Sequence, residues 1–367
     1  GGKFRYAPPA GFNALSSRNL DEPAFSANPN RPENVDDNFE AFTYTGNSDS
    51  TRTISGFNFQ ADLMWNKARN QTFSHRIYDS TRGNDKGIFS NNTSVESTHD
   101  VFNGFTSDGF NTTTDGSAGD LLNYNGGTYV VWNWKGNAGT TSSNDSGDIT
   151  TTVQVNTKAG FSIITYTGSG TDGNTIGHGL NQQPDFIIGT PRDSSGSNRV
   201  VWHKEISLGT FLKLNLTDAV ATSDQFVSVS DTLIGVGGNA NLSGKAQVIW
   251  CWHEVAGYSK FGSYTGNGND NGPYIHLGFR PKLFVAKRTD STNDWQVMDS
   301  SRNPTNVMDG LLFWNLSNSD TSDAAYNRDF LSNGVKIRGS ESYVNASGGT
   351  FVYMAWAESP FKYSNAA

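Results

Sequence analysis

Short runs of apolar residues recur along the whole chain, and turns containing Gly, Asn, Asp or Pro separate them. The spacing of these turns, about 8–12 residues, is typical of antiparallel β-sandwiches and jelly rolls of about 100 residues. Composition agrees with this, since Gly is high at 40 residues and charged residues reach only 17%. The pattern therefore predicts an all-β protein rather than a helical bundle.

One apolar run, "GGTYVVWNWK" at 126–135, carries two tryptophans two positions apart. Similar runs follow at 245–254 ("KAQVIWCWHE") and 348–358 ("GGTFVYMAWAE"). Because side chains alternate between the two faces of a strand, each run places an aromatic-rich set on one face. The sets are Val130, Trp132 and Trp134, then Val248, Trp250 and Trp252, then Val352, Met354 and Trp356.

Two interpretations fit this aromatic-rich face. Its side chains either fill the core of each sandwich, where one such residue contributes about 1.5–3 kcal/mol by burial, or form a platform on which sugars stack. The third copy favours the core, because Met354 stands where the other copies have Trp. Methionine packs well in a core but stacks poorly on a sugar ring.

Further strings recur in the same order in three parts of the chain. The strings "FTYTGN", "ITYTGS" and "GSYTGN" contain Tyr44, Tyr166 and Tyr264. The strings at 76–83 and 296–303 share Asp-Ser-(Thr/Ser)-Arg, whereas 200–207 keeps only the strand pattern. A strand with an Asn-containing end is clear at 211–218 and 311–318 and weaker at 87–94. Such ordered agreement predicts that one unit is present three times.

The repeats predict three tandem, antiparallel, jelly-roll-like β-sandwich domains after a short N-terminal segment. That segment is 1–37, the end of a preceding module or a docking arm, and the domains are 38–146, 157–258 and 259–367. The Gly-, Ser- and Thr-rich stretch 136–160 predicts a flexible connector or a long edge loop, with 147–156 as the linker. Almost no linker separates the last two domains, so we expect these to sit rigidly against each other.

Charge and hydropathy limit the classes of partner that the chain is expected to bind. The net charge of -8, with no cluster of Lys or Arg, argues against nucleic acid. No apolar run approaches the roughly 20 residues needed to cross a bilayer, so we expect no membrane insertion. The single cysteine, Cys251, lies within "WCW" and is predicted to be a buried hydrophobe rather than a nucleophile. The start "GGKFRY" lacks Met and a signal peptide, which indicates a processed or partial chain.

Paired carboxylates for glycoside cleavage are the most serious enzymatic hypothesis. The candidates are Asp79 and Asp299, each within Asp-Ser-x-Arg, whereas the middle copy has His203. Such chemistry needs two carboxyls facing each other across about 5–10 Å. Asp followed by Ser and a nearby Arg is more often a turn with a surface ion pair. We therefore predict that the chain is not an enzyme and has no catalytic residues.

Metal and cofactor sites are not predicted either, and the sequence does not identify binding residues. The histidines lack the spacing of metal ligands, and the Gly-rich strings lack the Lys-Ser/Thr ending of a phosphate loop. Asn215 and Asn315 stand in Asn-x-Ser/Thr triplets, which arise by chance in a chain this rich in Asn and Ser. The six histidines are His75, His99, His178, His203, His253 and His276.

Several strings resemble known families. "FRYAPPAGFNALSSRNLDEP" at 4–23 resembles the last strand and exit of the SPRY-like, lectin-type sandwich of many phage structural proteins. "GFSIITYTGSG", "GHGLNQQPDFII", "GYSKFGSYTGNG" and "NASGGTFVYMAWAESPF" are similar to a domain of unknown function that follows such modules in virion proteins of marine and freshwater phages. This likeness covers nearly all of 157–363 and implies a particle component, without catalytic residues to transfer.

The function expected from these observations is that of a non-enzymatic bacteriophage virion protein. It would be a fibre-like or decorating appendage on the particle surface, a rod of tandem sandwiches that contacts other virion proteins or the host surface. Exposed sandwich edges favour a homo-oligomer. The alternative is a carbohydrate-binding, receptor-binding module that engages host glycans through several weak sites, with no cofactor in either case.

Overall fold

The computed structural model describes residues 23–25, 34–98, 101–113 and 122–360. Within these residues the chain is all-β, built of antiparallel sheets, as the sequence predicts. Most of the expected N-terminal segment, 1–37, lies outside the described residues. Its described part includes one 3-10 turn, η2 (Val35–Asp37), which leads into the first strand.

Module 1, which we define as the chain from β1 to β9, has two facing sheets with the strand orders β1-β9-β3-β4 and β2-β8-β7. Met64 and Val131 of the larger sheet share one buried cluster with Ile54 and Phe110 of the smaller sheet, so the module is a β-sandwich. Its strands are β1 (Phe39–Thr45), β2 (Thr51–Ser55), β3 (Leu63–Ala68), β4 (Arg76–Asp79), β7 (Phe102–Thr106), β8 (Gly109–Thr113) and β9 (Thr128–Trp134), with a separate pair β5 (Lys86–Gly87) and β6 (Ser97–Thr98).

Module 2 runs from β10 to β20 and has sheets of order β10-β11-β12-β20-β14-β15-β16-β17 and β13-β19-β18. The central strand β20 lies between β12 and β14, just as β9 lies between β1 and β3. The strands are β10 (Ser142–Asn144), β11 (Thr151–Asn156), β12 (Phe161–Thr167), β13 (Asn174–Gly177), β14 (Phe186–Pro191), β15 (Val200–His203), β16 (Thr210–Lys213), β17 (Ala221–Thr222), β18 (Phe226–Val229), β19 (Leu233–Val236) and β20 (Ala246–Trp252), with one 3-10 turn, η3 (Gly238–Asn241).

Module 3 runs from β21 to β29 and repeats the arrangement, with orders β21-β29-β23-β24-β25-β26 and β22-β28-β27. Short helical turns η4 (Ala324–Tyr326) and α1 (Ser342–Asn345) lie in its loops. The strands are β21 (Ser259–Thr265), β22 (Tyr274–His276), β23 (Phe279–Arg288), β24 (Gln296–Asp299), β25 (Gly310–Phe313), β26 (Thr321–Ser322), β27 (Arg328–Leu331), β28 (Gly334–Ile337) and β29 (Thr350–Pro360).

The recurring Tyr-Thr-Gly string forms the same turn in every module. Each tyrosine hydroxyl donates to a backbone carbonyl about 80 residues later in the chain, and each glycine lies where a Cβ would stand 2.1–2.2 Å from another carbonyl oxygen. Only glycine fits there, which explains why the string is repeated. The hydroxyl pairs are Tyr44 with Leu122, Tyr166 with Ala240 and Tyr264 with Val344, and the glycines are Gly46, Gly168 and Gly266.

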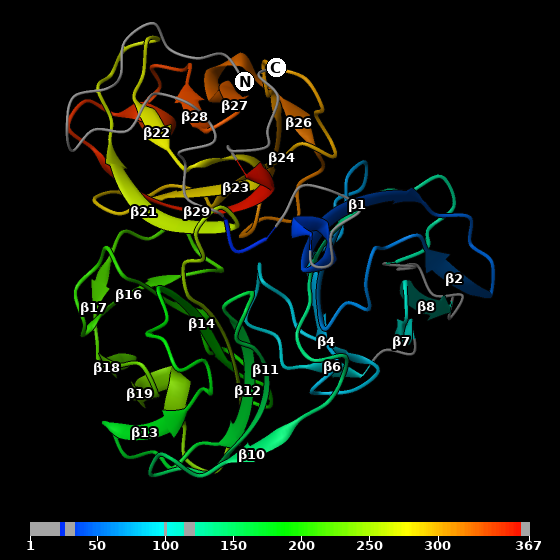
Figure 1. Cartoon of the computed structure of the whole chain (residues 1–367), viewed down its shortest axis with the longest axis vertical. Coiled ribbons are helices and arrows are strands. Elements are labelled where there is room, and N and C mark those ends of the chain that lie inside the picture. The colour runs from blue at the N-terminus through cyan, green and yellow to red at the C-terminus, as the bar shows by residue number, and fades with distance from the viewer. Residues whose placement is uncertain (1–22, 26–33, 99–100, 114–121, 361–367) are drawn as a thin grey trace, which may run out of the picture.

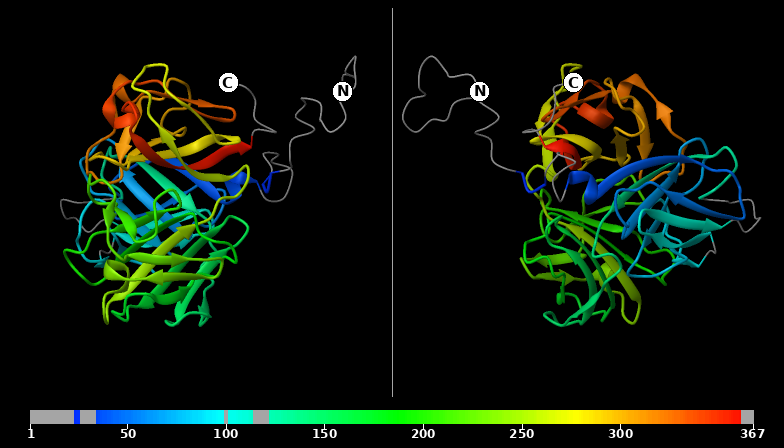
Figure 2. Two further views of the ribbon diagram at one scale, coloured as in Figure 1. Left: turned by 90° about the vertical axis from the view of Figure 1, so that its left-hand side faces the viewer. Right: turned by 45° about the vertical axis from the view of Figure 1, so that its right-hand side comes forward.

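The three modules lie around a common centre (Figure 1). One buried cluster runs through all of them and includes Trp132, Trp250 and Met354. The two further views show the same clustering of modules (Figure 2). The rod expected from tandem sandwiches is therefore not what the described residues form. The central strands of the large sheets, such as β3, β9 and β20, have buried side chains on both faces, so that the second face packs against the other modules.

At the centre, Trp134, Trp252 and Trp356 contact one another, and we call them the hub tryptophans. Their ring centroids are 5.2–5.9 Å apart with interplanar angles of 61–74°, and each is at most 2% exposed. Edge-to-face contacts of this kind add to the stabilisation from burial. The aromatic-rich faces are thus buried, as favoured by the sequence, but they lie between modules rather than inside each sandwich. They offer no platform for sugars.

The prediction that 147–156 is a linker is wrong. This stretch contains strand β11, which pairs with β12 along its length. Val153 and Gln154 are both buried, and the Gln154 side chain bonds Ser80 of module 1. The stretch therefore adds a hairpin, β10 and β11, to the edge of the large sheet of module 2. The sequence obscured this strand because a short strand rich in Thr, Gln and Asn resembles a polar loop.

Candidate functional site

Asp79, one of the two carboxylates considered for glycoside cleavage, is fully buried where β4 ends. It accepts the backbone N–H and the Nε–H of Arg82 at 2.9 and 2.5 Å, and the Nε1–H of Trp250 in module 2 at 2.9 Å. Arg82 also pairs with Glu96 at 2.8 Å, and Glu96 with Arg192 of module 2 at 2.9 Å. We call this the charged chain of seam 1–2, the boundary between modules 1 and 2.

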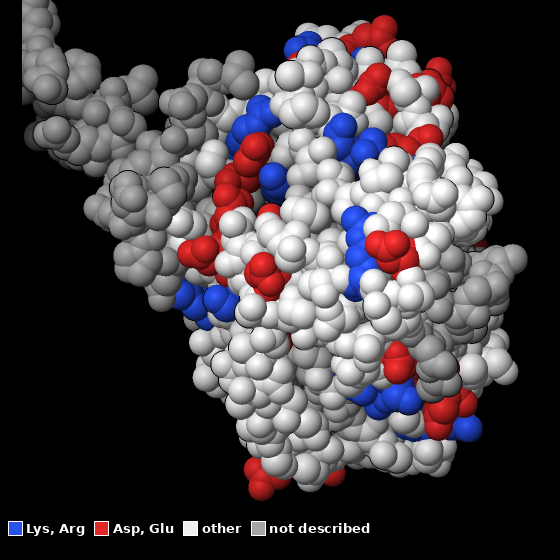
Figure 3. All heavy atoms as spheres, turned by 90° about the vertical axis from the view of Figure 1, so that its right-hand side faces the viewer, with Lys and Arg blue, Asp and Glu red and all other residues white. Residues whose placement is uncertain are grey.

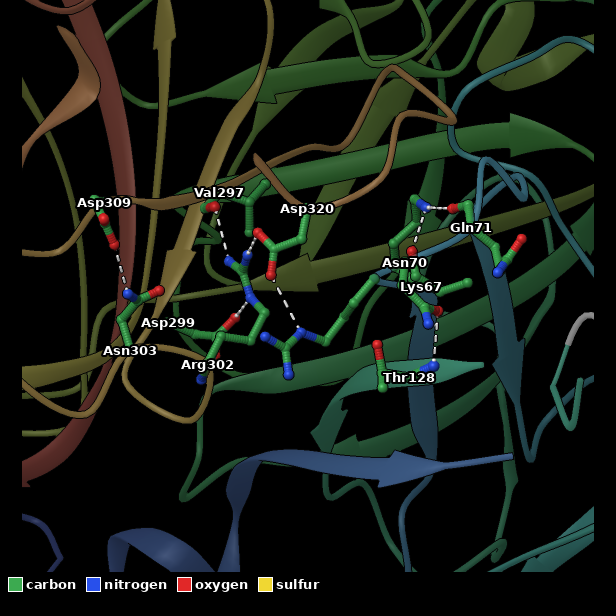
Figure 4. A network of polar contacts seen from close by, with 12 residues as sticks. Lys67, Asn70, Gln71, Thr128, Val297, Asp299, Arg302, Asn303, Asp309 and Asp320 are labelled. Atoms are coloured by element: carbon green, nitrogen blue, oxygen red, sulfur yellow. Dashed lines mark hydrogen bonds and ion pairs between the residues drawn. The ribbon is translucent and has the colours of Figure 1, made fainter. Parts of the chain in front are cut away.

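Asp299 stands in the same arrangement where module 3 meets module 1, which we call seam 3–1 (Figure 4). It is fully buried and accepts the N–H and Nε–H of Arg302 at 2.9 and 2.6 Å. It also accepts the Nε1–H of Trp132 in module 1 at 3.1 Å. Arg302 pairs with Asp320 at 2.8 Å, and Asp320 with Arg69 of module 1 at 3.1 Å. The charged chain is therefore present at both seams.

Seam 2–3, the boundary between modules 2 and 3, has neutral side chains at all the positions that correspond to the charged chains of the other two seams. His203 pairs with Phe186 in the sheet as Asp79 pairs with Leu63, so it takes the place of the aspartate. Its Nε2–H donates to the carbonyl of Tyr353 in module 3 at 3.2 Å. His203 and Ile206 replace the aspartate and the first arginine, and Met354 replaces the tryptophan. Val220 replaces the acidic residue that pairs with that arginine, and Thr289 replaces the second arginine.

The three seams explain why the middle copy lacks Asp-Ser-x-Arg. A buried carboxylate without its arginine and indole donors would be strongly unfavourable, so the whole set changes together. Asp79 and Asp299 belong to different seams, are closed off from solvent and hold modules together. The structure does not present them as a facing pair in an open cleft, the geometry that glycoside cleavage requires.

His75 is also a seam residue. It is fully buried, its Nδ1 accepts the Nε1–H of Trp65 at 2.9 Å, and its Nε2 lies 2.8 Å from the carbonyl oxygen of Phe313 in module 3. Both ring nitrogens of His75 therefore have partners when the imidazole is neutral and its proton is on Nε2. Burial lowers the pKa of His75 well below its usual value.

His178 and His203 are buried as well, and the same reasoning applies. The ring nitrogens of His178 lie 3.2 Å from the carbonyl of Ser230 and 3.3 Å from the N–H of Leu180. Burial lowers the pKa of His178 to about 4 and that of His203 to about 3. Within the described residues no group of three or more His, Cys, Asp or Glu is placed to hold a metal ion.

The other histidines are dispersed. His253 bonds the carbonyl of Glu254 at 2.9 Å, His276 lies beside Tyr274, and His99 lies outside the described residues. Cys251 is buried in β20, and burial raises the pKa of its thiol. The buried Cys251 thus has a structural role in β20.

The Asn-containing strand ends have a shared task that the sequence indicated only weakly. In each module the asparagine side-chain oxygen accepts the backbone N–H that precedes a large-sheet strand, at 2.8–3.1 Å. Asn215 and Asn315 act in this way, and so does Asn91, which lies in the weaker string at 87–94. The Asn-x-Ser/Thr triplets at 215 and 315 are therefore part of the fold.

The β10–β11 hairpin is the main departure from threefold repetition. β1 and β21, which correspond to β12, are edge strands of their described sheets. Beside the hairpin lie two open hollows of about 460 and 330 Å³, and both are lined by Asn137 and Val155. We call the two together the insertion groove. Binding sites are concave and commonly lie between modules, which makes this groove the candidate site.

One wall of the groove, the loop between β9 and β10, is held to module 1 by hydrogen bonds. Asp62 of module 1 accepts the N–H groups of Gly136, Ala138 and Gly139 at 2.8–2.9 Å, which fixes the loop between β9 and β10. Burial raises the pKa of Asp62, although these donors oppose the shift. The groove is thus formed before any ligand arrives.

The floor and rim of the first hollow are rich in polar groups. Asn156 donates to the side chain of Asn38 at 3.0 Å and to the carbonyl of Lys135 at 3.2 Å. Lys158 lies over the ring of Phe25, 5.3 Å from its centroid. Phe25 is buried, so its ring offers no face for stacking, and the polar groups of this hollow suit hydrogen bonding to sugar hydroxyls.

Asn58 lines the first hollow, and Glu40 bonds it from outside that lining. The Glu40 carboxylate accepts the backbone N–H of Asn58 at 3.1 Å and contacts its side-chain amide at 3.4 Å. Burial is the largest cause that raises the pKa of Glu40, to about 7.

One face of the molecule is dominated by uncharged groups. On the face shown in Figure 3, acidic and basic side chains lie scattered among a majority of other residues. Among the helices that the structure describes, none has the length and apolar character needed to cross a bilayer.

Comparison with known proteins identifies a family but no function. The family model of a domain of unknown function, DUF7483, matches residues 34–360, and the chain belongs to that family. This single match spans all three modules, in agreement with their shared core. Neither the curated proteins nor the solved structures contain a significant match.

Proposed function

We propose that this member of the DUF7483 family is a non-enzymatic structural protein of a bacteriophage particle, a fibre-like or decorating appendage. The resemblance of 157–363 to domains of virion proteins supports this proposal. So does the closed arrangement of three modules around the hub tryptophans. Modules that share one core should unfold together, which suits a component that must persist outside the cell.

The observation that carries the proposal is the buried hub, because it joins three repeated modules into one rigid unit. Stacking copies of a module and burying their shared faces is a way to gain stability and size without chemistry. Such a unit could be placed on a particle as a compact knob, with its variable turns facing outward. Contact with other virion proteins and self-association remain part of this proposal.

The test is to image purified particles that carry a tag on Ala367 and to measure the chain by mass spectrometry. Tag density at tail tips supports host contact, and density on the shell supports decoration. A chain that is abundant in the infected lysate but missing from purified particles would refute the proposal.

The second candidate is a carbohydrate-binding module, and the insertion groove favours it. The groove is open, preformed and lined with amides and hydroxyls, including Asn137, Thr141 and Ser142. Because module 2 is the one module whose described large sheet carries the extra hairpin, we place one glycan site at seam 1–2 rather than three equal sites. Binding of oligosaccharides by the purified chain, competed by free sugar, is the measurement that separates this candidate from a purely structural role.

A further inference from the structure

We propose that the insertion groove takes an acidic oligosaccharide, with a sugar carboxylate at its lysine-lined end and sugar hydroxyls along the rest. This inference rests on the carbohydrate-binding candidate and names its ligand class. The two hollows differ in chemistry, and that difference carries the inference.

The first hollow has an excess of positive charge. Lys135 and Lys158 are its two cationic lining residues, and Asp37 is its one carboxylate. The Asp37 carboxylate accepts the backbone N–H of Asn34 at 2.7 Å, so part of its hydrogen-bonding capacity is used within the protein. In a chain with a net charge of -8, a local excess of ammonium groups stands out and suits a carboxylate ligand.

Lys135 is specific to this seam. Its backbone N–H donates to the carbonyl of Asn38 just after the central strand, and His253 and Ala357 make the same bond after β20 and β29. The repeat therefore does not need a cation at this position. A lysine appears only in the copy whose neighbour is the inserted hairpin.

The second hollow suits an uncharged, hydroxylated sugar. Thr140, Thr141, Ser142 and Ser143 are exposed along it, and Val153 and Val155 supply an apolar floor. A sugar ring has the complementary arrangement, with hydroxyls at its edge and C–H groups on its face.

Asn137 joins the two hollows. It is exposed and lines both, and the one hydrogen bond of its side chain within the described residues is a long one, 3.4 Å, to the carbonyl of Thr140. A side-chain amide can make up to four hydrogen bonds, so Asn137 retains capacity for a ligand that lies across both hollows. A single monosaccharide would not use both ends, which is why we infer an oligosaccharide.

The test measures binding of a galacturonic acid trimer and of maltotriose to the full chain by isothermal titration calorimetry. We expect the acidic trimer to bind more tightly, and its affinity to fall as salt is raised, because charges at an exposed groove are screened. Lys135→Gln should weaken the trimer by about tenfold, or about 1.4 kcal/mol, and leave maltotriose unchanged, because only the acidic sugar loses an ammonium partner. Asn137→Ala should weaken both sugars.

Lys245→Gln is the matched control, because Lys245 precedes β20 and lies outside the groove. Thermal unfolding of each variant shows that it is folded. If both sugars bind equally well and Lys135→Gln has no effect, the acidic class is wrong while glycan binding stands. If neither sugar binds, both inferences fail, and the particle proposal is still judged by imaging.

Discussion

Replacing Asp299 by Ala tests whether the charged chain holds seam 3–1 closed. Modules 1 and 3 are not consecutive in the sequence, so no direct linker joins them across this seam. The substitution leaves the Arg302 guanidinium, which is buried, with the carbonyl of Val297 and the carboxylate of Asp320. It also removes the acceptor of the Trp132 indole N–H. Removing one partner of a buried ion pair costs about 3–5 kcal/mol, and we expect a loss of that size.

The assay is equilibrium unfolding in urea, with Arg302→Ala and the double variant completing a mutant cycle. The double variant removes both charges, so its loss should be smaller than the sum of the single losses by about 2–3 kcal/mol. The matched control is the same cycle on His203 and Ile206 at seam 2–3, where we expect coupling below about 1 kcal/mol because no ion pair is present. A loss below about 1 kcal/mol for Asp299→Ala, or an additive cycle, would refute the reasoning.

Three further predictions follow from buried groups. Trp252→Ala should lower the free energy of unfolding by about 3–5 kcal/mol and separate the urea transitions of the modules, because it opens the hub. A single unchanged transition would contradict this. Stability should fall as pH drops below 6.5, because His75 and His203 stay neutral in the fold but gain protons once unfolded. Urea unfolding at pH 7 and pH 5 measures this loss. At pH 5 the His203 part should be about 2 kcal/mol, so His203→Gln should show a smaller loss. Cys251 should not react with a thiol reagent until urea unfolds the chain, and rapid labelling of the folded protein would show that β20 is exposed.

Much of the local structure could be predicted from the sequence. The period-two pattern placed Val130, Trp132 and Trp134 on one face because strand geometry fixes which side chains share a face. The Tyr-Thr-Gly strings marked turns whose glycines have no room for a Cβ. The all-β class follows from the same local rules.

The groove was not predictable in the same way. The stretch 136–160 reads as a connector because its strands are short, polar and at a sheet edge, where no alternation of apolar residues is required. Lys135 and Lys158 become neighbours of one hollow only when β11 is placed beside β12.

The sequence by itself determined most of the strands, their turns and their threefold repetition, because these depend on the chemistry of neighbouring residues. Only the tertiary structure decided that the aromatic faces meet at one hub, and that Asp79 and Asp299 bond tryptophans of other modules. A face that is apolar by pattern does not say which other face will cover it. That choice depends on packing between residues far apart in the chain, and there the buried carboxylates became part of the seams.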